Sequence, residues 1–203
     1  MRERRELVFL GRSDRDLRDF PEKVQIEVTR QLNLVRVGLD PTDWKPMKTI
    51  GVGVSEIRVR DESGAYRVIY LAKLKDAVYV LHCFEKNPRR PAAKISNLRL
   101  SGSSSSSEEA LEYVEIKDIW DALSLDPDVR ERERLLSDVS IAILKRIDQK
   151  GWTQKEAAKQ MGVTQPRVSD LKRQKLDLFS IDSLVSMAGK AGIHFDIDYK
   201  FDP

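Results

Sequence analysis

The hydrophobic positions at the start of the chain follow first a strand pattern and then a helical one. Leu7–Leu10 is a short apolar run that predicts a strand, and Ser13 can cap a helical segment that extends to Phe20. Between Pro21 and Gly38, apolar residues recur at helical spacing, at Val24, Val28, Leu32 and Val35. Pro21 suits the first turn of a helix and Gly38 its end, so a second helix is predicted here.

Farther along, the pattern becomes that of strands. Val54–Arg60, Tyr66–Lys73 and Val78–Glu85 are rich in Val, Ile and Tyr, and turn residues separate them. The elements therefore follow the order of a strand, two helices and an antiparallel meander of three or four strands. This order predicts a small α+β domain in which two helices pack on an antiparallel sheet.

The second half of the chain has mainly helical patterns. Ile116–Leu123 is expected to form a short helix, Asp128 begins a charged helix, and Ser137–Lys150 is amphipathic. Three more helical segments follow, and the alternating stretch His194–Phe201 predicts a strand. We therefore expect a mainly α domain with a C-terminal strand.

A serine-rich run separates the two halves. Ser101–Glu109 contains no apolar residue and has the composition of a flexible linker. We expect one domain at 1–100, a linker at 101–109 and a second domain at 110–203. The alternative is a long surface loop within a single domain.

Composition and charge narrow the classes of function. One cysteine and two histidines exclude an internal disulfide, a Cys-based zinc finger and a His-rich metal site, so we expect neither metal nor cofactor. The chain has neither a signal-peptide pattern nor an apolar run near the ~20 residues of a membrane span, which favours a cytoplasmic protein without a membrane partner. Residues 1–100 contain 21 Lys and Arg against 14 Asp and Glu, whereas residues 101–136 contain 4 against 10. The first block can thus bind a polyanion, and the acidic connector can compete for that site.

The strongest local signal is the segment Trp152–Leu171. Thr153 can cap a helix with Glu156 completing a capping box, and Gly162 supplies a turn. Thr164 can cap the next helix, with Pro166 in its first turn. This pattern predicts a helix-turn-helix whose second helix enters the DNA major groove.

From Ile116 to Tyr199 the chain resembles antitoxins of the XRE/Cro-like family, which implies a DNA-binding core at 137–192 and a homodimer on operator DNA. The dimer contacts are expected after Phe179, including the strand around Phe195 and Ile197. Gln can pair with adenine and Arg with guanine, while Lys172 and Arg173 suit phosphate contacts. The expected DNA-binding residues are Thr153, Gln154, Thr164, Gln165, Arg167, Ser169, Lys172 and Arg173. The alternative is a solvated helix face on an interaction-only domain, although six basic against two acidic residues at 152–175 favour DNA.

Cationic residues mark the predicted strands of the first half. Glu56, Arg58 and Arg60 alternate onto one face of their strand, and Arg67 interrupts an apolar strand. A cation in such a position is costly unless it faces a site. Several cations on neighbouring strands predict a phosphate-binding surface.

Three motifs in this half resemble the Gp49-like branch of the RelE/HigB-type toxins. They are Ile50–Arg58, Tyr66–Tyr70 and Leu81–Lys86, and the resemblance covers about residues 7–95. It implies mRNA cleavage without a metal, usually on the ribosome, by attack of the 2′-hydroxyl on the adjacent phosphate. Lys86–Pro91 and the short segment Ala92–Leu100 depart from the branch's usual basic tail, which bears on activity.

The resemblance also implies roles for five residues. Arg67 would stabilise the transition state, and Arg58 and Arg60 would bind phosphate. Lys86 would act on the leaving group or serve as a second electrostatic clamp. Glu56 would orient Arg67 or Arg58, or serve as a weak base. Two further residues have open readings. His82 is either a general base or a packed core histidine, and its phase with Val78, Val80 and Phe84 favours the core; Trp44 could stack on a base or pack on the sheet.

These observations predict a toxin–antitoxin pair on one chain, with an endoribonuclease inhibited by an antitoxin that represses its own operon. The segment 110–136 would dock on the toxin half, in cis or in trans, through Leu111, Ile116, Ile119 and Trp120. The rival hypothesis is a non-enzymatic repressor whose first domain serves only assembly or sensing.

Overall fold

The computed structural model describes residues 4–72, 77–86, 113–116, 118–121, 123 and 125–196. The chain forms two compact units, Met1–Arg130 and Glu131–Pro203. The predicted linker at 101–109, the segment 92–100 and Leu111 lie outside the described residues, so the expected domain boundaries stay a prediction.

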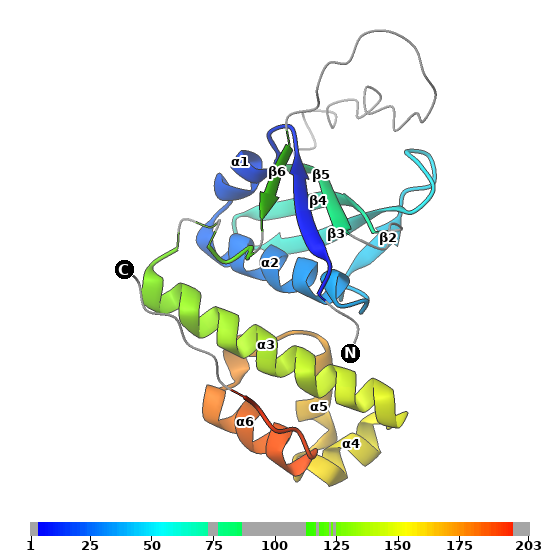
Figure 1. Ribbon diagram of the computed structural model, residues 1–203, viewed down its shortest axis with the longest axis vertical. Coiled ribbons are helices and arrows are strands. Elements are labelled where there is room, and N and C mark those ends of the chain that lie inside the picture. The colour runs from blue at the N-terminus through cyan, green and yellow to red at the C-terminus, as the bar shows by residue number, and fades with distance from the viewer. Residues whose placement is uncertain are drawn as a thin grey trace, which may run out of the picture. The chain divides into compact units, whose positions relative to one another are not determined.

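The first unit is built on a mixed sheet of six described strands (Figure 1). The strands are β1 (Glu6–Leu10), β2 (Trp44–Pro46), β3 (Val54–Asp61), β4 (Gly64–Leu71), β5 (Ala77–Glu85) and β6 (Tyr113–Ile116), in the spatial order β2-β3-β4-β5-β1-β6. The predicted antiparallel meander is confirmed for β3, β4 and β5. The sheet is not wholly antiparallel, because β1 pairs with β5 in parallel. The helices and strands between β1 and β5 bring the chain back so that β5 runs in the same direction as β1. A hairpin connection could not do this, because it joins antiparallel strands.

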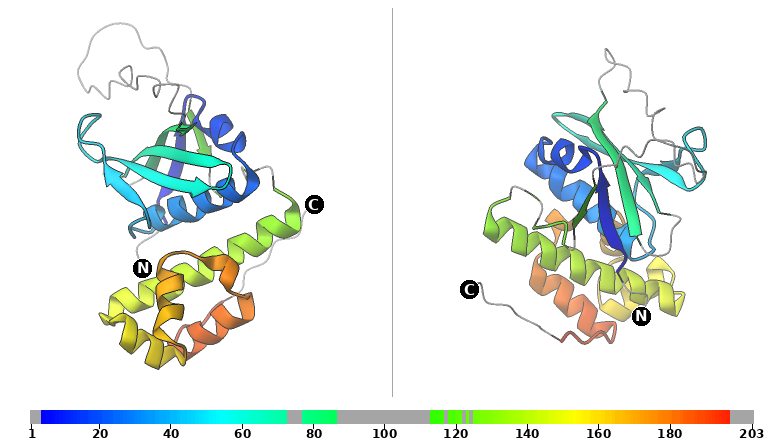
Figure 2. Two further views of the ribbon diagram at one scale, coloured as in Figure 1. Left: turned by 180° about the vertical axis from the view of Figure 1, so that it is seen from behind. Right: turned by 45° about the horizontal axis from the view of Figure 1, so that its top comes forward.

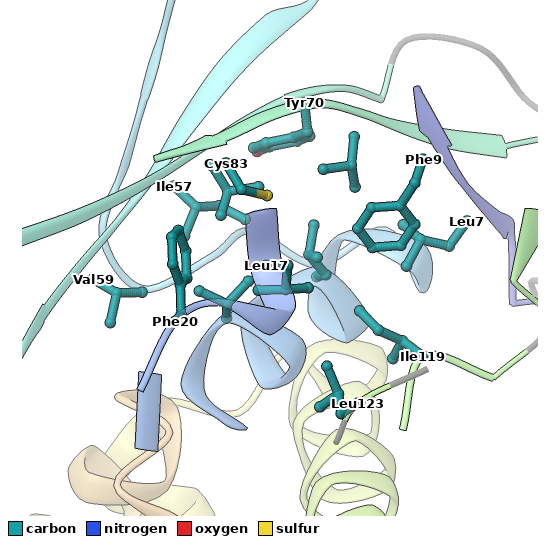
Figure 3. Close-up of a cluster of buried hydrophobic side chains, with 14 of the residues drawn as sticks. Leu7, Phe9, Leu17, Phe20, Ile57, Val59, Tyr70, Cys83, Ile119 and Leu123 are labelled. Atoms are coloured by element: carbon teal, nitrogen blue, oxygen red, sulfur yellow. The ribbon is translucent and has the colours of Figure 1, made fainter. Parts of the chain in front are cut away.

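Two helices cover one face of this sheet, as predicted. They are α1 (Ser13–Arg18) and α2 (Glu22–Arg36), with Pro21 at the N-cap of α2 and Gly38 beyond its end at φ 82°. Leu17 of α1 and Val28 and Leu32 of α2 belong to the same buried cluster as the inward side chains of the strands (Figure 3). Ser13 does not cap α1 as expected, since its hydroxyl donates instead to the Val80 carbonyl at 3.0 Å.

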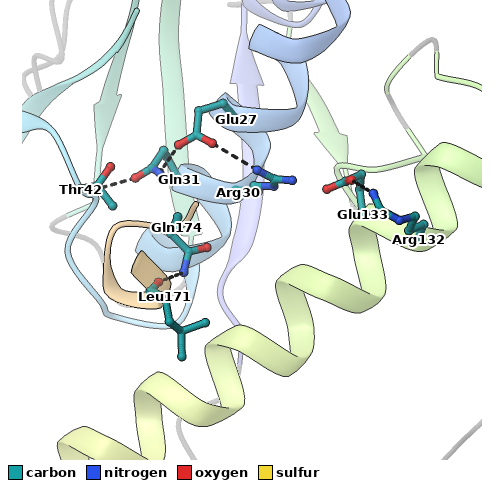
Figure 4. A network of polar contacts seen from close by, with 8 residues as sticks. All are labelled: Glu27, Arg30, Gln31, Thr42, Arg132, Glu133, Leu171 and Gln174. Atoms are coloured by element: carbon teal, nitrogen blue, oxygen red, sulfur yellow. Dashed lines mark hydrogen bonds and ion pairs between the residues drawn. The ribbon is translucent and has the colours of Figure 1, made fainter. Parts of the chain in front are cut away.

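A polar network ties α2 to the loop that follows it (Figure 4). The Gln31 amide donates to Glu27 at 2.6 Å, and its oxygen accepts from the Thr42 backbone N–H at 2.8 Å. Glu27 also pairs with Arg30 at 3.5 Å. These contacts fix the chain just before β2.

The predicted short helix at Ile116–Leu123 is wrong. Tyr113–Ile116 forms β6, which pairs with β1, and Ile119–Asp121 forms a turn. The sequence Tyr-Val-Glu-Ile has high strand propensity, and an exposed edge of β1 offers backbone partners that a helix cannot use. The Asp118 carboxylate accepts from the Trp120 backbone N–H at 3.0 Å, which favours a turn over a continuing helix.

The second unit is helical, and Figures 1 and 2 show its helices packed together. They are α3 (Pro127–Lys150), whose first turn belongs to the first unit, α4 (Gln154–Met161), α5 (Gln165–Lys172), the 3-10 turn Leu176–Leu178 and α6 (Ile181–Lys190). The charged and amphipathic segments predicted separately form the one helix α3. Its Ile143 and Ile147 pack with Met161, Leu171 and other residues in one buried cluster.

The predicted C-terminal strand is only partly within the described residues. His194, Phe195 and Asp196 are not in a strand, and Ile197 and the residues after it lie outside the described part. Among the described residues, no helix is both long and apolar enough to cross a membrane.

Candidate functional site

Residues of three adjacent strands bring the predicted cations together on the sheet face opposite the helices. Strand register sets three rows across β3, β4 and β5. Glu56, Ile69 and His82 make the first row; Arg58, Arg67 and Phe84 make the second. In the third, Arg60 pairs with Ala65, whose carbonyl accepts from the Lys86 backbone N–H at 2.6 Å. We call these rows the cationic face.

Arg67 is the most constrained member of the cationic face. Its Nε lies 3.3 Å from Glu56 Oε1, and its Nη1 donates to the Tyr66 carbonyl at 2.8 Å. The residue is only 5 % exposed. A buried charge is strongly unfavourable without a partner, so the ion pair with Glu56 offsets the cost of burying the Arg67 guanidinium. Of the expected roles for Glu56, the contact supports orientation of Arg67.

Arg58 has a different carboxylate partner, which sequence reasoning missed. Its Nη2 lies 2.6 Å from Asp43 Oδ1 and also donates to the Trp44 carbonyl at 3.4 Å. The Arg58 backbone N–H donates to the Asp43 carbonyl at 2.9 Å, which holds the two segments in register. No local pattern pairs residues fifteen positions apart; only the β2–β3 pairing does so.

Arg60 and Lys86 occupy the outer row of the cationic face. Both side chains are exposed, and each belongs to a residue that flanks Ala65 of β4. The structure therefore places Glu56, Arg58 and Arg60 on β3, Arg67 on the neighbouring β4, and Lys86 directly after the end of β5. Arg67 and Arg58 lie inside the face, whereas Arg60 and Lys86 reach solvent at its rim.

His82 is not the packed core histidine that its phase favoured. A register shift at Ile69/Tyr70 interrupts the alternation along β5, so Val78 and Val80 join the helix-covered core while Phe84 packs with the opposite cluster. His82 stacks on Phe84 with ring centroids 5.1 Å apart. Its Nδ1 lies 3.8 Å from Asp16 Oδ2, and its side chain is 28 % exposed. Strand register thus places His82 on the cationic face. Regular alternation along β5 would not predict this position, because it follows from the register shift.

Two other reactive groups of this unit are buried in the core. Burial raises the pKa of the Cys83 thiol well above its usual value and raises the pKa of Tyr70 to about 12. Both groups stay neutral near pH 7, so neither serves as an activated nucleophile. Trp44 is partly exposed at the β2 edge of the sheet.

The second unit contains the predicted helix-turn-helix, formed by α4 and α5. Thr153 caps α4: its hydroxyl accepts from the Glu156 N–H at 3.3 Å, and Glu156 accepts from the Thr153 N–H at 2.8 Å. The backbone and hydroxyl hydrogen bonds from Thr153 lower the pKa of the Glu156 carboxyl. Gly162 turns the chain with φ 64°, a conformation that glycine adopts easily. Thr164 occupies the N-cap of α5, but its side chain makes no capping hydrogen bond.

One side of α5 is buried and the other carries the expected DNA contacts. Val168 and Leu171 lie in the core, whereas Thr164, Gln165, Lys172 and Arg173 are exposed and Ser169 is partly exposed. The Arg167 guanidinium carbon lies 3.8 Å from the centroid of the Phe179 ring, a cation–π contact. Thr153 is exposed and Gln154 partly exposed at the start of α4. The Gln174 amide donates to the Leu171 carbonyl at 3.3 Å and closes the end of α5 (Figure 4).

Comparison with known proteins finds one family match in each half of the chain. Residues 15–97 match the family of phage derived Gp49-like proteins, and residues 126–200 match a helix-turn-helix domain family. No curated protein matches the sequence. Neither match includes residues 98–125, which contain β6 and the buried Trp120.

Proposed function

Because the chain joins a Gp49-like domain of the RelE/HigB-type toxin family to a helix-turn-helix domain, we propose that it is a toxin–antitoxin module on one polypeptide. The first half is a metal-independent mRNA endoribonuclease of the HigB type that acts on the ribosome. The second half is an XRE/Cro-like antitoxin of the HigA type. It neutralises the first and represses its own operon.

The cationic face is the single observation that carries the enzymatic part. Cleavage through the 2′-hydroxyl builds negative charge on the phosphorane oxygens, and positioned guanidinium groups stabilise that charge. Arg67, held by Glu56, suits this role because its donors are oriented before the substrate arrives. Arg58 and Arg60 then bind flanking phosphates, and Lys86 at the rim neutralises the leaving 5′-oxygen.

His82 completes the reaction scheme as the group that takes the 2′-hydroxyl proton. Imidazole is the side chain that most often performs such transfers, and His82 shares its row with Glu56. Asp16 lies within 3.8 Å of Nδ1 and can hold the ring in one orientation. The stacked Phe84 restricts the ring further.

The recognition helix α5 supports the DNA-binding part. Gln165 and Lys172 are exposed on one side of the helix while Val168 anchors the other. Cro-like domains read half-sites about one helical turn apart, so the operator-bound form is a homodimer. A protein that meets mRNA, ribosomes and operator DNA works in the cytoplasm.

A specific observation favours the rival function, a repressor without catalysis. Arg67 and Arg58 each have a carboxylate within 3.3 Å, and Arg67 is 5 % exposed. Arginines that are paired with carboxylates, such as the buried Arg67 and the partly exposed Arg58, can also stabilise a fold that no longer binds phosphate. In that case the first unit serves only assembly or sensing.

Comparing the whole chain with its first compact unit, Met1–Arg130, separates the two functions. Each is incubated with an mRNA, with and without ribosomes, and the cleavage sites are mapped by primer extension. The module predicts cleavage by Met1–Arg130, products ending in a 2′,3′-cyclic phosphate, and little cleavage by the whole chain. Folded Met1–Arg130 that leaves mRNA intact under both conditions would overturn the enzymatic part and leave the repressor as the remaining function.

A further inference from the structure

We infer that residues 113–125 are a built-in structural part of the first unit, which adds its outer strand and completes its core. Without them, residues 1–100 do not hold the fold. The inference depends on the proposed function only in calling residues 1–100 the toxin half. The inference concerns the structural role of the segment in the first unit. A segment that only docked on the toxin half as an inhibitor would not need to be part of its core.

The first observation is strand addition at the edge of the sheet. β6 runs antiparallel to β1, with Leu7 opposite Ile116, Phe9 opposite Val114 and Leu10 opposite Tyr113. On its other side β1 pairs with β5. Without β6, one side of β1 would present unpaired backbone N–H and C=O groups, which is the usual condition of an edge that accepts another strand.

The second observation is the burial of the residues that follow β6. Ile119 and Trp120 are 0 % exposed, and Leu123 and Leu125 are also buried. All four belong to the same cluster as Leu7, Phe9 and Leu17, and Figure 3 shows Ile119 and Leu123 at one end of it, with Cys83 and Ile57 at the other. A docked surface segment keeps its side chains at a boundary, whereas these residues are part of the core itself.

The third observation is the distance in the sheet between this segment and the cationic face. The order β4-β5-β1-β6 places β5 and β1 between β6 and the strand of Arg67. The buried side chains at 119–125 enter the cluster under the helices, whereas Arg67, His82 and Phe84 belong to the opposite face. The described part of the segment therefore supports the fold of the first unit without occupying the candidate site.

Neither family match includes this segment. The Gp49-like match ends at residue 97 and the helix-turn-helix match begins at 126. The first unit nevertheless extends to Arg130. The described residues between 113 and 125 thus belong to the first unit, and we expect that cutting the chain within 101–109 would not release a folded toxin half.

The sole cysteine provides a test in the full-length chain. Cys83 is buried in the core cluster, so its reaction with a thiol reagent such as dithiobis(nitrobenzoate) reports opening of the first unit. Trp120→Ala should raise the labelling rate about 100-fold or more, and the milder Ile119→Val about threefold to tenfold. Trp44→Ala is the matched control. It also removes a tryptophan side chain, but from a partly exposed position on β2 at the opposite edge of the sheet, and it should raise the labelling rate by less than about tenfold.

Amide hydrogen exchange in the same variants shows where the opening occurs. The inference predicts faster exchange throughout α2, β1 and β4 in Trp120→Ala, with α4 and α5 unchanged as the internal control. If Trp120→Ala is isolated with Cys83 immediately reactive and α4 and α5 protected, the inference also stands, and Ile119→Val then supplies the graded measurement. Cys83 labelling within about threefold of the parent, or faster exchange confined to β6 and β1, would overturn it. None of these readouts requires RNA cleavage, so they remain decisive if the proposed activity is absent.

Discussion

Glu56 on β3 and Arg67 on β4 form an ion pair on the sheet face opposite the helices, with 3.3 Å between Glu56 Oε1 and Arg67 Nε. Both side chains are nearly buried, so solvent and salt screen the pair only weakly. A guanidinium has five N–H donors, and the contacts with Glu56 and the Tyr66 carbonyl use two of them. The pair therefore orients Arg67 without using all of its donors.

Removing the carboxylate should destabilise the first unit. Glu56→Ala leaves Arg67 buried without its partner, and we expect the free energy of unfolding to fall by about 3 kcal/mol. Glu56→Gln keeps an oxygen that can accept from Arg67 and should cost less. Urea denaturation of the full-length variants measures both, with the exposed Glu62→Gln as control. Equal urea midpoints for Glu56→Ala and the control would show that the pair does not contribute.

His82 should matter more for cleavage than for stability. His82→Gln removes the proposed proton acceptor, and we expect the cleavage rate of Met1–Arg130 to fall about 100-fold. Because the side chain is partly exposed, the free energy of unfolding should change by less than about 1 kcal/mol. A loss of stability of several kcal/mol with unchanged cleavage by the folded fraction would instead restore the core reading.

Operator recognition should depend on Gln165 and Arg167. Each substitution by Ala should cost about 1–3 kcal/mol on the cognate operator and relax specificity. Phe179→Leu keeps an apolar residue in the core but removes the ring under Arg167, so it should weaken operator binding in the same direction. Fluorescence anisotropy with operator and random DNA measures these effects. Equal losses on both DNAs for Arg167→Ala would contradict the assignment of a base contact.

Lys172 should behave differently, because its exposed side chain suits a phosphate contact. Lys172→Ala should weaken binding to operator and random DNA alike, and should reduce the slope of log affinity against log salt by about 1. A loss restricted to the operator would identify Lys172 as a base contact instead.

The capping box of α4 should make the second unit sensitive to acid. Hydrogen bonds from Thr153 lower the pKa of Glu156 below its ordinary value of 4.5. A carboxyl with a lowered folded-state pKa adds stability above its unfolded pKa, and that stability is lost as the pH falls through the folded-state pKa. Glu156→Gln keeps a capping side chain without a titrating group, so it should lose less stability between pH 7 and pH ~3.5. The urea midpoint at each pH, monitored by amide exchange in α4, measures this loss of stability. An equal loss in the parent and in Glu156→Gln would contradict the prediction.

The elements that sequence reasoning predicted are those whose signals are local. The capping box at Thr153, the turn at Gly162 and the apolar positions Val168 and Leu171 all lie within one short segment, and the structure confirms each. The meander strands β3, β4 and β5 were likewise predictable, because β-branched runs and turn residues lie next to each other in the chain.

The missed features depend on pairings between distant segments. The strand β6 exists because β1 offers it an edge, and nothing near Tyr113 in the sequence specifies that partner. Asp43 meets Arg58 only through the β2–β3 pairing. The face of His82 follows from a bulge, and one shifted residue reverses every side chain beyond it.

The most direct test of the proposed activity is the single-turnover rate of mRNA cleavage by Met1–Arg130 and its Arg67→Ala variant, with ribosomes present. Arg18→Ala, which removes an arginine of α1 paired with Asp14, is the matched control. We predict that Arg67→Ala lowers the rate about 100-fold or more, the usual loss when one oriented donor to a developing charge is removed, while Arg18→Ala stays near the parent. Equal rates for Arg67→Ala and Arg18→Ala, both folded, would contradict the proposal that the cationic face cleaves RNA.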